Sequence, residues 1–297
     1  MNYKEMLQNS LPGWNGRLAA HHVSYLGDGH VHRAVPYNPL DPKVVATKLA
    51  LMQSVGIDVV ISTWQGIYAP ESNSDTILMA KMCAEVGMQH ALLLDPWCAK
   101  LGPPNGVVTA PSTQNVIDSL SASSAILNAS SYVPEKFILD FNTGANLGTL
   151  AKQFPQYDFL AQGAGFSWIS IPPNLTPDNP ACNAASVANL KSQHSNPAMK
   201  VASFCMGFND AGMPLPANVQ SMTAFLAAGG KRDWTQSVWG GPARILYSYE
   251  GEFAQQQIAT IPPNVPIVAL VTWDDVDECT AIEPKVAEAA GVNWATL

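Results

Sequence analysis

A dense group of acidic residues near the end of the chain is the first feature that could do chemistry. The stretch VTWDDVDECTAIEP, residues 271–284, holds five carboxylates within ten residues: Asp274, Asp275, Asp277, Glu278 and Glu283. Only 13% of the chain is charged, about half the usual share, so the cluster needs a specific cause. Two neighbouring carboxyl groups are the minimal equipment for cleaving a glycosidic bond, one as proton donor and one as ionised base or nucleophile. Crowding at the end of an apolar strand separates two carboxyl pKa values in that direction.

The elements that must position these acids follow a regular alternation of strand-like and helix-like stretches. Near-continuous apolar runs predict strands at 17–26, 57–64, 88–97, 135–142, 165–171, 200–208, 233–241 and 266–273. Helices are predicted at 41–56, 74–87, 111–129, 145–154, 181–193, 217–230, 242–259 and 284–291. Apolar strands of this kind are typical of a parallel sheet covered by helices. Eight strand–helix units in 297 residues predict an α/β fold, a (β/α)8 TIM barrel forming a single domain over 1–297.

The residues at the carboxyl ends of the predicted strands form a second chemical pattern, because barrel enzymes place their chemistry there. Carboxylates can accept hydrogen bonds from sugar hydroxyls, and indole rings can pack on the C–H faces of a sugar. His22 and its neighbour His21 stand at the first strand end. The predicted glycan-binding residues are His22, Trp64, Asp95, Trp97, Asp140, Trp168, Trp239 and Trp273. Each also has a structural explanation, since a Trp can pack in the core and an Asp can cap the following helix.

Several stretches resemble glycoside hydrolase family 99 and related bacterial proteins, which are (β/α)8 enzymes acting on α-mannosides. WDDVDECTAIEP resembles the last-strand motif of the family, which runs roughly Asn-Glu-Trp-x-Glu-Gly-Thr-x-Ile-Glu-Pro; Thr280, Ile282, Glu283 and Pro284 fit it. DPKVVATKLALMQSVGIDVVISTWQG resembles the family's first helix, second strand and aromatic loop, and GGPARILYSYEGEF is a less specific match before the last strand. The resemblance therefore covers most of the chain.

The resemblance implies roles for two of the five acids. Asp275 and Glu278 match the family's pair in spacing, so Asp275 is expected to act on the sugar's 2-hydroxyl and Glu278 to be the general acid/base. The resemblance implies hydrolysis of an α-linked glycan, with mannose-containing glycans among the candidates, and no cofactor. The chain departs from the motif at four positions: Asp274 stands for Asn, Asp275 for Glu, Val276 for Trp and Cys279 for Gly. Because Asp is one methylene shorter than Glu, the Asp275 carboxylate reaches less far than that of the family, and a displacement of about 1 Å can cost roughly 100-fold in rate.

Other classes of protein stay open as alternatives. A non-catalytic barrel that binds glycan, or that builds a virion or a surface layer, would explain the altered motif and the low charge content. A metal-dependent amidohydrolase would use His30 and His32, but it would also need histidines in the runs 165–171 and 200–208, which have none. A doubly wound open sheet is the alternative fold, although no Gly-rich phosphate turn follows the first strand.

Composition narrows the partners that the chain can take. The formal net charge is −8 and the 15 basic residues form no block, which argues against nucleic acid. The sequence contains no run of about 18 apolar residues, so no membrane span is predicted. No basic segment followed by an apolar one, as in a signal peptide, is visible at the N-terminus. The five cysteines show no CxxC spacing, so free thiols are expected and no metal site is predicted. The sequence leaves the oligomeric state and the compartment open.

Overall fold

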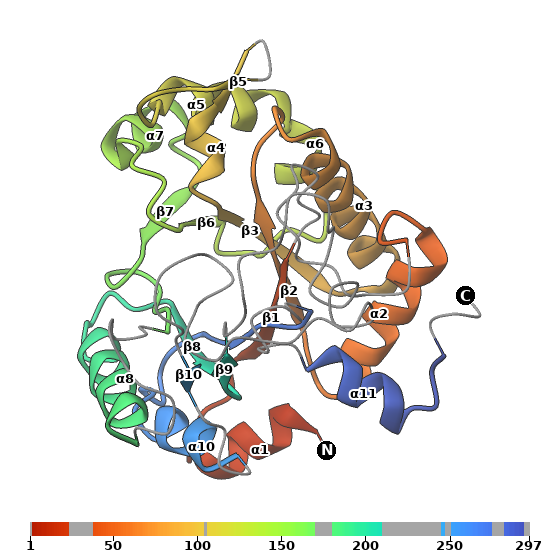
Figure 1. Ribbon diagram of the computed structural model, residues 1–297, viewed down its shortest axis with the longest axis vertical. Coiled ribbons are helices and arrows are strands. Elements are labelled where there is room, and N and C mark those ends of the chain that lie inside the picture. The colour runs from red at the N-terminus through yellow and green to blue at the C-terminus, as the bar shows by residue number, and fades with distance from the viewer. Residues whose placement is uncertain are drawn as a thin grey trace, which may run out of the picture.

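The centre of the molecule is a parallel β-sheet. The computed structural model describes residues 2–23, 38–103, 106–169, 180–209, 245–246, 251–274 and 282–293. Within them, seven strands pair in parallel in the following order: β7 (Asp158–Ala161), β6 (Phe137–Asp140), β3 (Gln89–Leu94), β2 (Val59–Trp64), β1 (Arg17–Val23), β11 (Ile267–Val271) and β8 (Val201–Cys205). The sheet curls, so the fold is a mixed α/β half-barrel, which agrees in part with the predicted TIM barrel (Figure 1).

A short segment after β7 connects the two edges of this sheet. Phe166 makes one parallel bridge to Gln162, just beyond β7, and another to Val201 in β8. The Lys200 N–H donates to the Gly165 carbonyl (2.7 Å), and the Ser167 N–H donates to the Val201 carbonyl (2.9 Å). The segment around Phe166 therefore lies between the two edge strands, although only single bridges join it to them.

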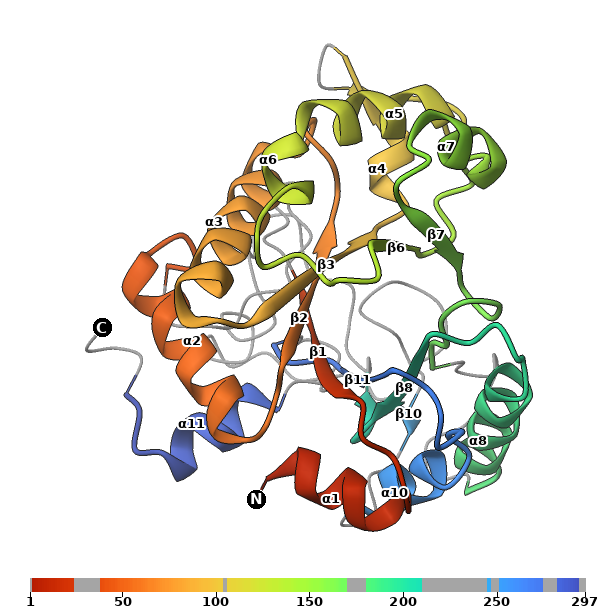
Figure 2. The ribbon, with the colours of Figure 1, turned by 180° about the vertical axis from the view of Figure 1, so that it is seen from behind.

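Helices cover the outer side of the curled sheet, as Figures 1 and 2 show from opposite directions. They are α1 (Tyr3–Ser10), α2 (Pro42–Ser54), α3 (Pro70–Val86), α4 (Trp97–Lys100), α5 (Thr113–Ala122), α6 (Ser124–Leu127), α7 (Leu147–Gln153), α8 (Pro180–His194), α10 (Glu252–Ile258) and α11 (Glu283–Ala289). Two short antiparallel pairs complete the described structure: β4 (Leu101–Gly102) with β5 (Gly106–Val107), and β9 (Phe208–Asn209) with β10 (Ile245–Leu246).

Local sequence signals explain where α2 begins and where α3 ends. The Asp41 side chain accepts a hydrogen bond from the Lys43 N–H, and Pro42 occupies the first helical position, where its missing N–H costs nothing. At the end of α3, Gly87 adopts a left-handed conformation (φ +74°) that favours glycine and closes the helix. These two helices hold side chains that meet the carboxyl ends of β1 and β11.

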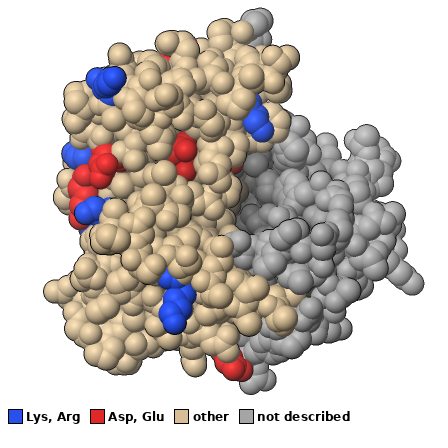
Figure 3. Space-filling model, turned by 90° about the vertical axis from the view of Figure 1, so that its left-hand side faces the viewer, with Lys and Arg blue, Asp and Glu red and all other residues tan. Residues whose placement is uncertain are grey.

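The core fills both sides of the sheet. On the helix side, Leu18 and Ala20 of β1 pack with Val45 and Met52 of α2 in one buried cluster. Ala19 belongs to a second cluster that includes Ile61 and Ala91, because successive strand residues point to opposite faces. On the face of the molecule shown in Figure 3, the charged residues are scattered singly or in small mixed groups.

Six of the predicted strands are confirmed, and the remaining differences have local causes. The strand β7 was not predicted, because DFLA is only partly buried and forms no continuous apolar run. The run predicted at 165–171 contributes single bridges at Phe166 within its described part. The helix predicted at 242–259 is wrong at its start, since 245–246 form β10 and α10 begins at Glu252. The strand predicted at 233–241 and the helix predicted at 217–230 lie outside the described residues.

Candidate functional site

Two adjacent histidines at the end of β1 point to opposite faces of the sheet. His22 faces the helices, because its ring contacts side chains that follow β11 and that lie on α3. His21 must then face the concave side, since neighbouring strand residues alternate. Both side chains are buried, with 0% exposure for His21 and 1% for His22. The sequence predicted a glycan contact at His22, and the structure gives the two rings separate environments.

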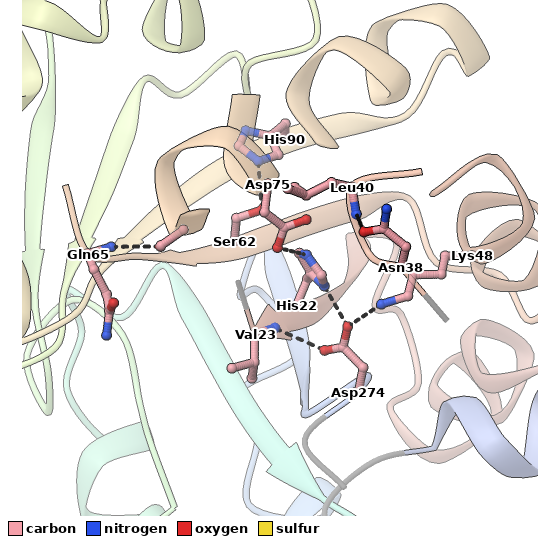
Figure 4. A network of polar contacts seen from close by, with 11 residues as sticks. His22, Val23, Asn38, Leu40, Lys48, Ser62, Gln65, Asp75, His90 and Asp274 are labelled. Atoms are coloured by element: carbon pink, nitrogen blue, oxygen red, sulfur yellow. Dashed lines mark hydrogen bonds and ion pairs between the residues drawn. The ribbon is translucent and has the colours of Figure 1, made fainter. Parts of the chain in front are cut away.

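On the helix side, four ionisable side chains form a buried group that we call the charge quartet: His22, Lys48, Asp75 and Asp274. The Asp274 Oδ2 atom lies 2.6 Å from His22 Nδ1 and 2.7 Å from Lys48 Nζ. His22 Nε2 lies 3.0 Å from Asp75 Oδ2. The other Asp274 oxygen, Oδ1, accepts a hydrogen bond from the Val23 N–H at 2.9 Å. Figure 4 shows the quartet at the junction of β1, α2, α3 and the end of β11.

The charges of the quartet are set by these contacts. Burial lowers the pKa of His22, but the Asp274 and Asp75 carboxylates outweigh it and raise the pKa to about 9. Burial raises the pKa of Asp274, but His22 and Lys48 outweigh it, so the pKa is held well below its usual range. His22 is therefore an imidazolium and Asp274 a carboxylate at neutral pH. Two cations face two anions, which limits the cost of burying them.

This bonding leaves neither Asp274 nor His22 suited to direct chemistry. Both oxygens of Asp274 accept strong hydrogen bonds, so the carboxylate is neither a proton donor nor an available nucleophile. Both nitrogens of His22 donate to carboxylates, so the ring has no spare polar atom for a sugar hydroxyl. The quartet is an anchoring structure at the end of β11.

A second histidine on the helix side is neutral. His90 Nε2 lies 2.9 Å from the Ser62 hydroxyl, close to Asp75 in Figure 4. Burial, together with the nearby positive charge of His22, lowers the pKa of His90 to about 3 despite the opposing effect of Asp75.

The concave side of the sheet holds a group of rings around His21. The ring centroids of His21 and Trp168 are 4.7 Å apart in an edge-to-face arrangement, and the centroid of Phe141 also lies 4.7 Å from that of Trp168. Trp168 and Phe141 are half-buried. Neither ring nitrogen of His21 has a hydrogen-bond partner in the structure as described. Burial lowers the pKa of His21 to about 3, so the ring is a neutral imidazole that could both donate and accept one hydrogen bond.

The other predicted glycan-binding residues lie in several environments. Trp64 and Trp273 are fully buried, and Trp64 Nε1 donates to Asn73 Oδ1 of α3 (3.1 Å), so the Trp64 ring packs towards that helix. Asp140 is 6% exposed and its Oδ1 accepts from the Thr143 hydroxyl (2.5 Å). Burial raises the pKa of Asp140, against the effect of the Thr143 bonds. Trp64, Trp273 and Asp140 belong to the packed core in this structure.

Asp95 and Trp97 lie at the carboxyl end of β3 and are half-buried. The Trp97 N–H donates to Asp95 Oδ1 at 2.9 Å, so Asp95 shapes the turn into α4. The Lys100 ammonium lies 5.4 Å from the centroid of the Trp97 ring. Asp95 and Trp97 are thus partly accessible, as a ligand-binding role would require.

The predicted catalytic pair, Asp275 and Glu278, lies outside the described residues, as do Trp239, His30 and His32. The structure does describe both ends of the chain around the pair. The Trp273 N–H donates to the His21 carbonyl (2.7 Å), and the Ile282 N–H donates to the Trp273 carbonyl (3.0 Å). The chain therefore leaves the described part beside His21 and returns to the same place.

Lys48 and Asp75 were missed by the sequence analysis, although one signal could have found Lys48. It stands in the apolar run VVATKLALM, and it lies three and four residues after Val45 and Val44 on the buried side of α2. A lysine at such a position needs a partner with the opposite charge. Asp75 gave no comparable signal, because an acid early in a helix is ordinarily favourable there.

Among the residues that the structure describes, no group of three or more His, Cys, Asp or Glu is arranged to hold a metal ion. Cys83, Cys98, Cys182 and Cys205 are free and buried. None of the described helices has the length and apolar character needed to cross a membrane.

Comparison with known proteins shows a likeness of fold. No protein-family model matches the chain, and no curated protein matches it by sequence. Two structures of the family 99 endo-α-mannosidase from Bacteroides thetaiotaomicron, one of them with bis-tris-propane, have TM-scores of 0.54 and 0.55 at 14% identity. The alignments cover 90% of this chain and 86% and 87% of those chains. A glycoside hydrolase-like protein has a TM-score of 0.54 at 10% identity, over 93% of this chain and 91% of that one.

These similarities confirm the resemblance to glycoside hydrolase family 99 at the level of fold. At such low identity the likeness shows the architecture alone, because one fold can carry many functions.

Proposed function

We propose that this chain is a glycoside hydrolase that cleaves an α-linked glycan, with Asp275 and Glu278 as its carboxylate pair. The observation that carries the proposal is the hydrogen bond between the Trp273 N–H and the His21 carbonyl. It brings the chain that leads into Asp275 next to the ring group on the concave side of the sheet. A carboxylate pair beside aromatic rings is the equipment that binding and cleaving a glycoside needs.

The proposal includes a complete (β/α)8 barrel. The seven parallel strands run from β7 to β8, and the segment around Phe166 bridges both edge strands. This segment would be the eighth member and would close the barrel between β7 and β8. The likeness to the family 99 endo-α-mannosidase supports this architecture. In such a barrel, His21, Trp168 and Asp95 stand at the carboxyl ends of the strands, where the loops form active sites.

The chemistry follows from the two acids. Glu278 gives its proton to the leaving oxygen as the bond from that oxygen to the anomeric carbon breaks. The ionised Asp275 accepts a hydrogen bond from the 2-hydroxyl of the same sugar, and this bond strengthens in the transition state. A water molecule then adds to the anomeric carbon and returns a proton to Glu278, which restores the acid. Trp168, Trp97 and Trp239 are proposed to contact sugar faces, and Asp95 to accept hydrogen bonds from hydroxyls. No cofactor takes part in these steps.

The test is release of reducing sugar from a panel of α-mannans, α-glucans and bacterial polysaccharides. The wild-type chain is expected to release sugar from at least one of them, and Asp275→Asn and Glu278→Gln are each expected to lower kcat by at least about 1,000-fold. Glu85→Gln is the matched control, because Glu85 is an exposed acid on α3. Unchanged turnover in Glu278→Gln would overturn the assignment of the pair.

The same panel separates catalysis from binding. Glycan binding by the wild-type chain with no release of sugar would identify a non-catalytic glycan-binding barrel instead. The altered acid motif, with Asp275 in place of the usual Glu, is the feature that makes this second outcome worth measuring.

A further inference from the structure

The charge quartet fixes one particular point of the chain, the end of β11. Its four members come from separate elements: His22 from β1, Lys48 from α2, Asp75 from α3, and Asp274 from the residues directly after β11. All four are buried. Asp274 receives three of the contacts, from His22 Nδ1, from Lys48 Nζ and from the Val23 N–H. Its carboxylate therefore ties β1 and α2 to a single backbone position after β11.

The backbone on both sides of the acid stretch is attached at the same point. Trp273, just before Asp274, is hydrogen-bonded to His21, and Ile282 is hydrogen-bonded back to Trp273. Lys48 comes from a helix outside the sheet, and its ammonium lies 2.7 Å from Asp274 Oδ2. A helix that packs on the outer face of the sheet thus reaches the place where the chain turns towards the proposed acids.

We propose that Lys48 and His22 are positioning residues: by holding the Asp274 carboxylate they fix the place and direction in which the chain leaves β11 towards Asp275 and Glu278. This inference rests on the proposed function for its effect on turnover. The anchoring itself is a property of the described residues, so it can be tested without a substrate.

The charge balance explains why Lys48 matters for more than packing. Lys48 and His22 are both cationic partners of the Asp274 carboxylate, so removing the lysine charge takes one of these partners from a buried carboxylate. A buried carboxylate that loses a partner must find another donor, take up a proton or move towards water. Each of these outcomes changes the position of Asp274, and the next residue in the chain is Asp275. A shift of about 1 Å at reacting groups can cost roughly 100-fold in rate.

The test compares Lys48→Met with Lys43→Met. Both lysines lie on α2, but the Lys43 side chain is exposed whereas Lys48 is buried, so the control makes the same substitution on the same helix away from the quartet. Amide hydrogen exchange is measured for peptides covering 267–271 and 275–281. We expect exchange in 275–281 to rise about tenfold or more in Lys48→Met and to stay unchanged in Lys43→Met, while 267–271 stays protected in both.

Turnover provides the second measurement. If the wild-type chain releases sugar, Lys48→Met is expected to lower kcat about 10- to 100-fold with KM changed less than about threefold, because binding groups elsewhere are retained. A structural role alone would lower the melting temperature and leave kcat unchanged well below it. Wild-type exchange at 275–281 together with wild-type kcat in folded Lys48→Met would overturn the inference.

A second variant keeps the inference testable if Lys48→Met does not fold. The double variant Lys48→Met/Asp274→Asn removes both charges of the pair, so no carboxylate is left without its ammonium. We expect the double variant to fold and to show the same rise in exchange at 275–281, because the introduced amide offers one acceptor oxygen in place of two. Wild-type exchange in this folded variant would overturn the inference. If the wild-type chain releases no sugar but the variants show raised exchange at 275–281, the proposed function is rejected. The anchoring of the chain by the charge quartet is then retained.

Discussion

The ring of His21 meets the ring of Trp168 at 4.7 Å between centroids, although Trp168 lies in none of the strands that pair with β1. β1 pairs with β2 and β11, whereas the segment before Trp168 bridges β7 and β8. A contact across this separation shows that the concave face of the sheet is curved. The contact therefore connects the fold to the site, because the curvature brings a neutral imidazole under a half-buried indole.

Replacing His21 tests whether this imidazole is kept for ligand binding. His21→Leu is expected to raise the free energy of unfolding by about 1 kcal/mol, because a buried polar group without a hydrogen-bond partner costs about 1–3 kcal/mol. The same variant is expected to bind glycan at least about fivefold more weakly, since it lacks the hydrogen bond to a hydroxyl. Urea unfolding and glycan titration measure the two quantities. Lower stability with unchanged affinity would show that the ring is held by internal water and has a structural role.

The tryptophans at the strand ends are expected to separate into two classes. Trp64→Leu is expected to cost about 3 kcal/mol in the free energy of unfolding, because the ring is fully buried and bonded to Asn73. Trp168→Leu is expected to cost less than half as much and to weaken glycan binding by about tenfold, because this ring is half-buried beside His21. Denaturant melts and binding titrations on both variants check the contrast. Equal effects on affinity would contradict it.

Sequence patterns predicted the sheet well where burial was continuous. VVISTW became β2, and IVALV became β11, because strands buried on both faces show uninterrupted apolar runs. The strand β7 escaped prediction because it is only partly buried, and its neighbour around Phe166 looked more strand-like. Helix boundaries followed their capping residues, as at Asp41 and Gly87.

The candidate site was predicted less completely. The face of the sheet to which a side chain points, and the side chains that it contacts, are determined by the fold. His21 and His22 are equivalent in a sequence, and a shift of one residue exchanges the concave face for the helix face. Asp274 was grouped with four other acids, and only its contacts with Lys48 and His22 separate it from a catalytic role. These partners lie 226 and 252 residues away along the chain, too far for any spacing rule to associate them.

Acid pH is expected to destabilise the protein through its neutral histidines. Burial lowers the pKa of His21 and of His90 to about 3, against an ordinary value of 6.5. Between pH 6.5 and pH 3 the unfolded chain therefore binds protons that the folded chain does not, and stability falls as the pH falls. Each ring is expected to contribute about 2 kcal/mol of loss at pH 5. Urea melts from pH 7 to pH 4.5 measure the slope, and His21→Leu/His90→Gln is expected to flatten it.

Alkaline pH is also expected to destabilise the protein, through the deprotonation of His22. Its carboxylate neighbours raise its pKa to about 9 in the folded chain, above the ordinary 6.5. A raised pKa contributes stability that is fully present below pH 6.5 and is lost as the pH rises through 9, with a total on the order of 3 kcal/mol. Urea melts between pH 6.5 and pH 9.5 are expected to show this decline.

Nuclear magnetic resonance of the histidine rings assigns that decline to His22. At pH 7.5 one ring is expected to carry protons on both nitrogens, as an imidazolium between Asp274 and Asp75, and to lose one of them only near pH 9. The rings of His21 and His90 are expected to be neutral at the same pH, so they provide internal controls in the wild-type chain. A neutral His22 at pH 7.5 would remove one cation from the quartet, and Lys48 alone would then hold the Asp274 carboxylate.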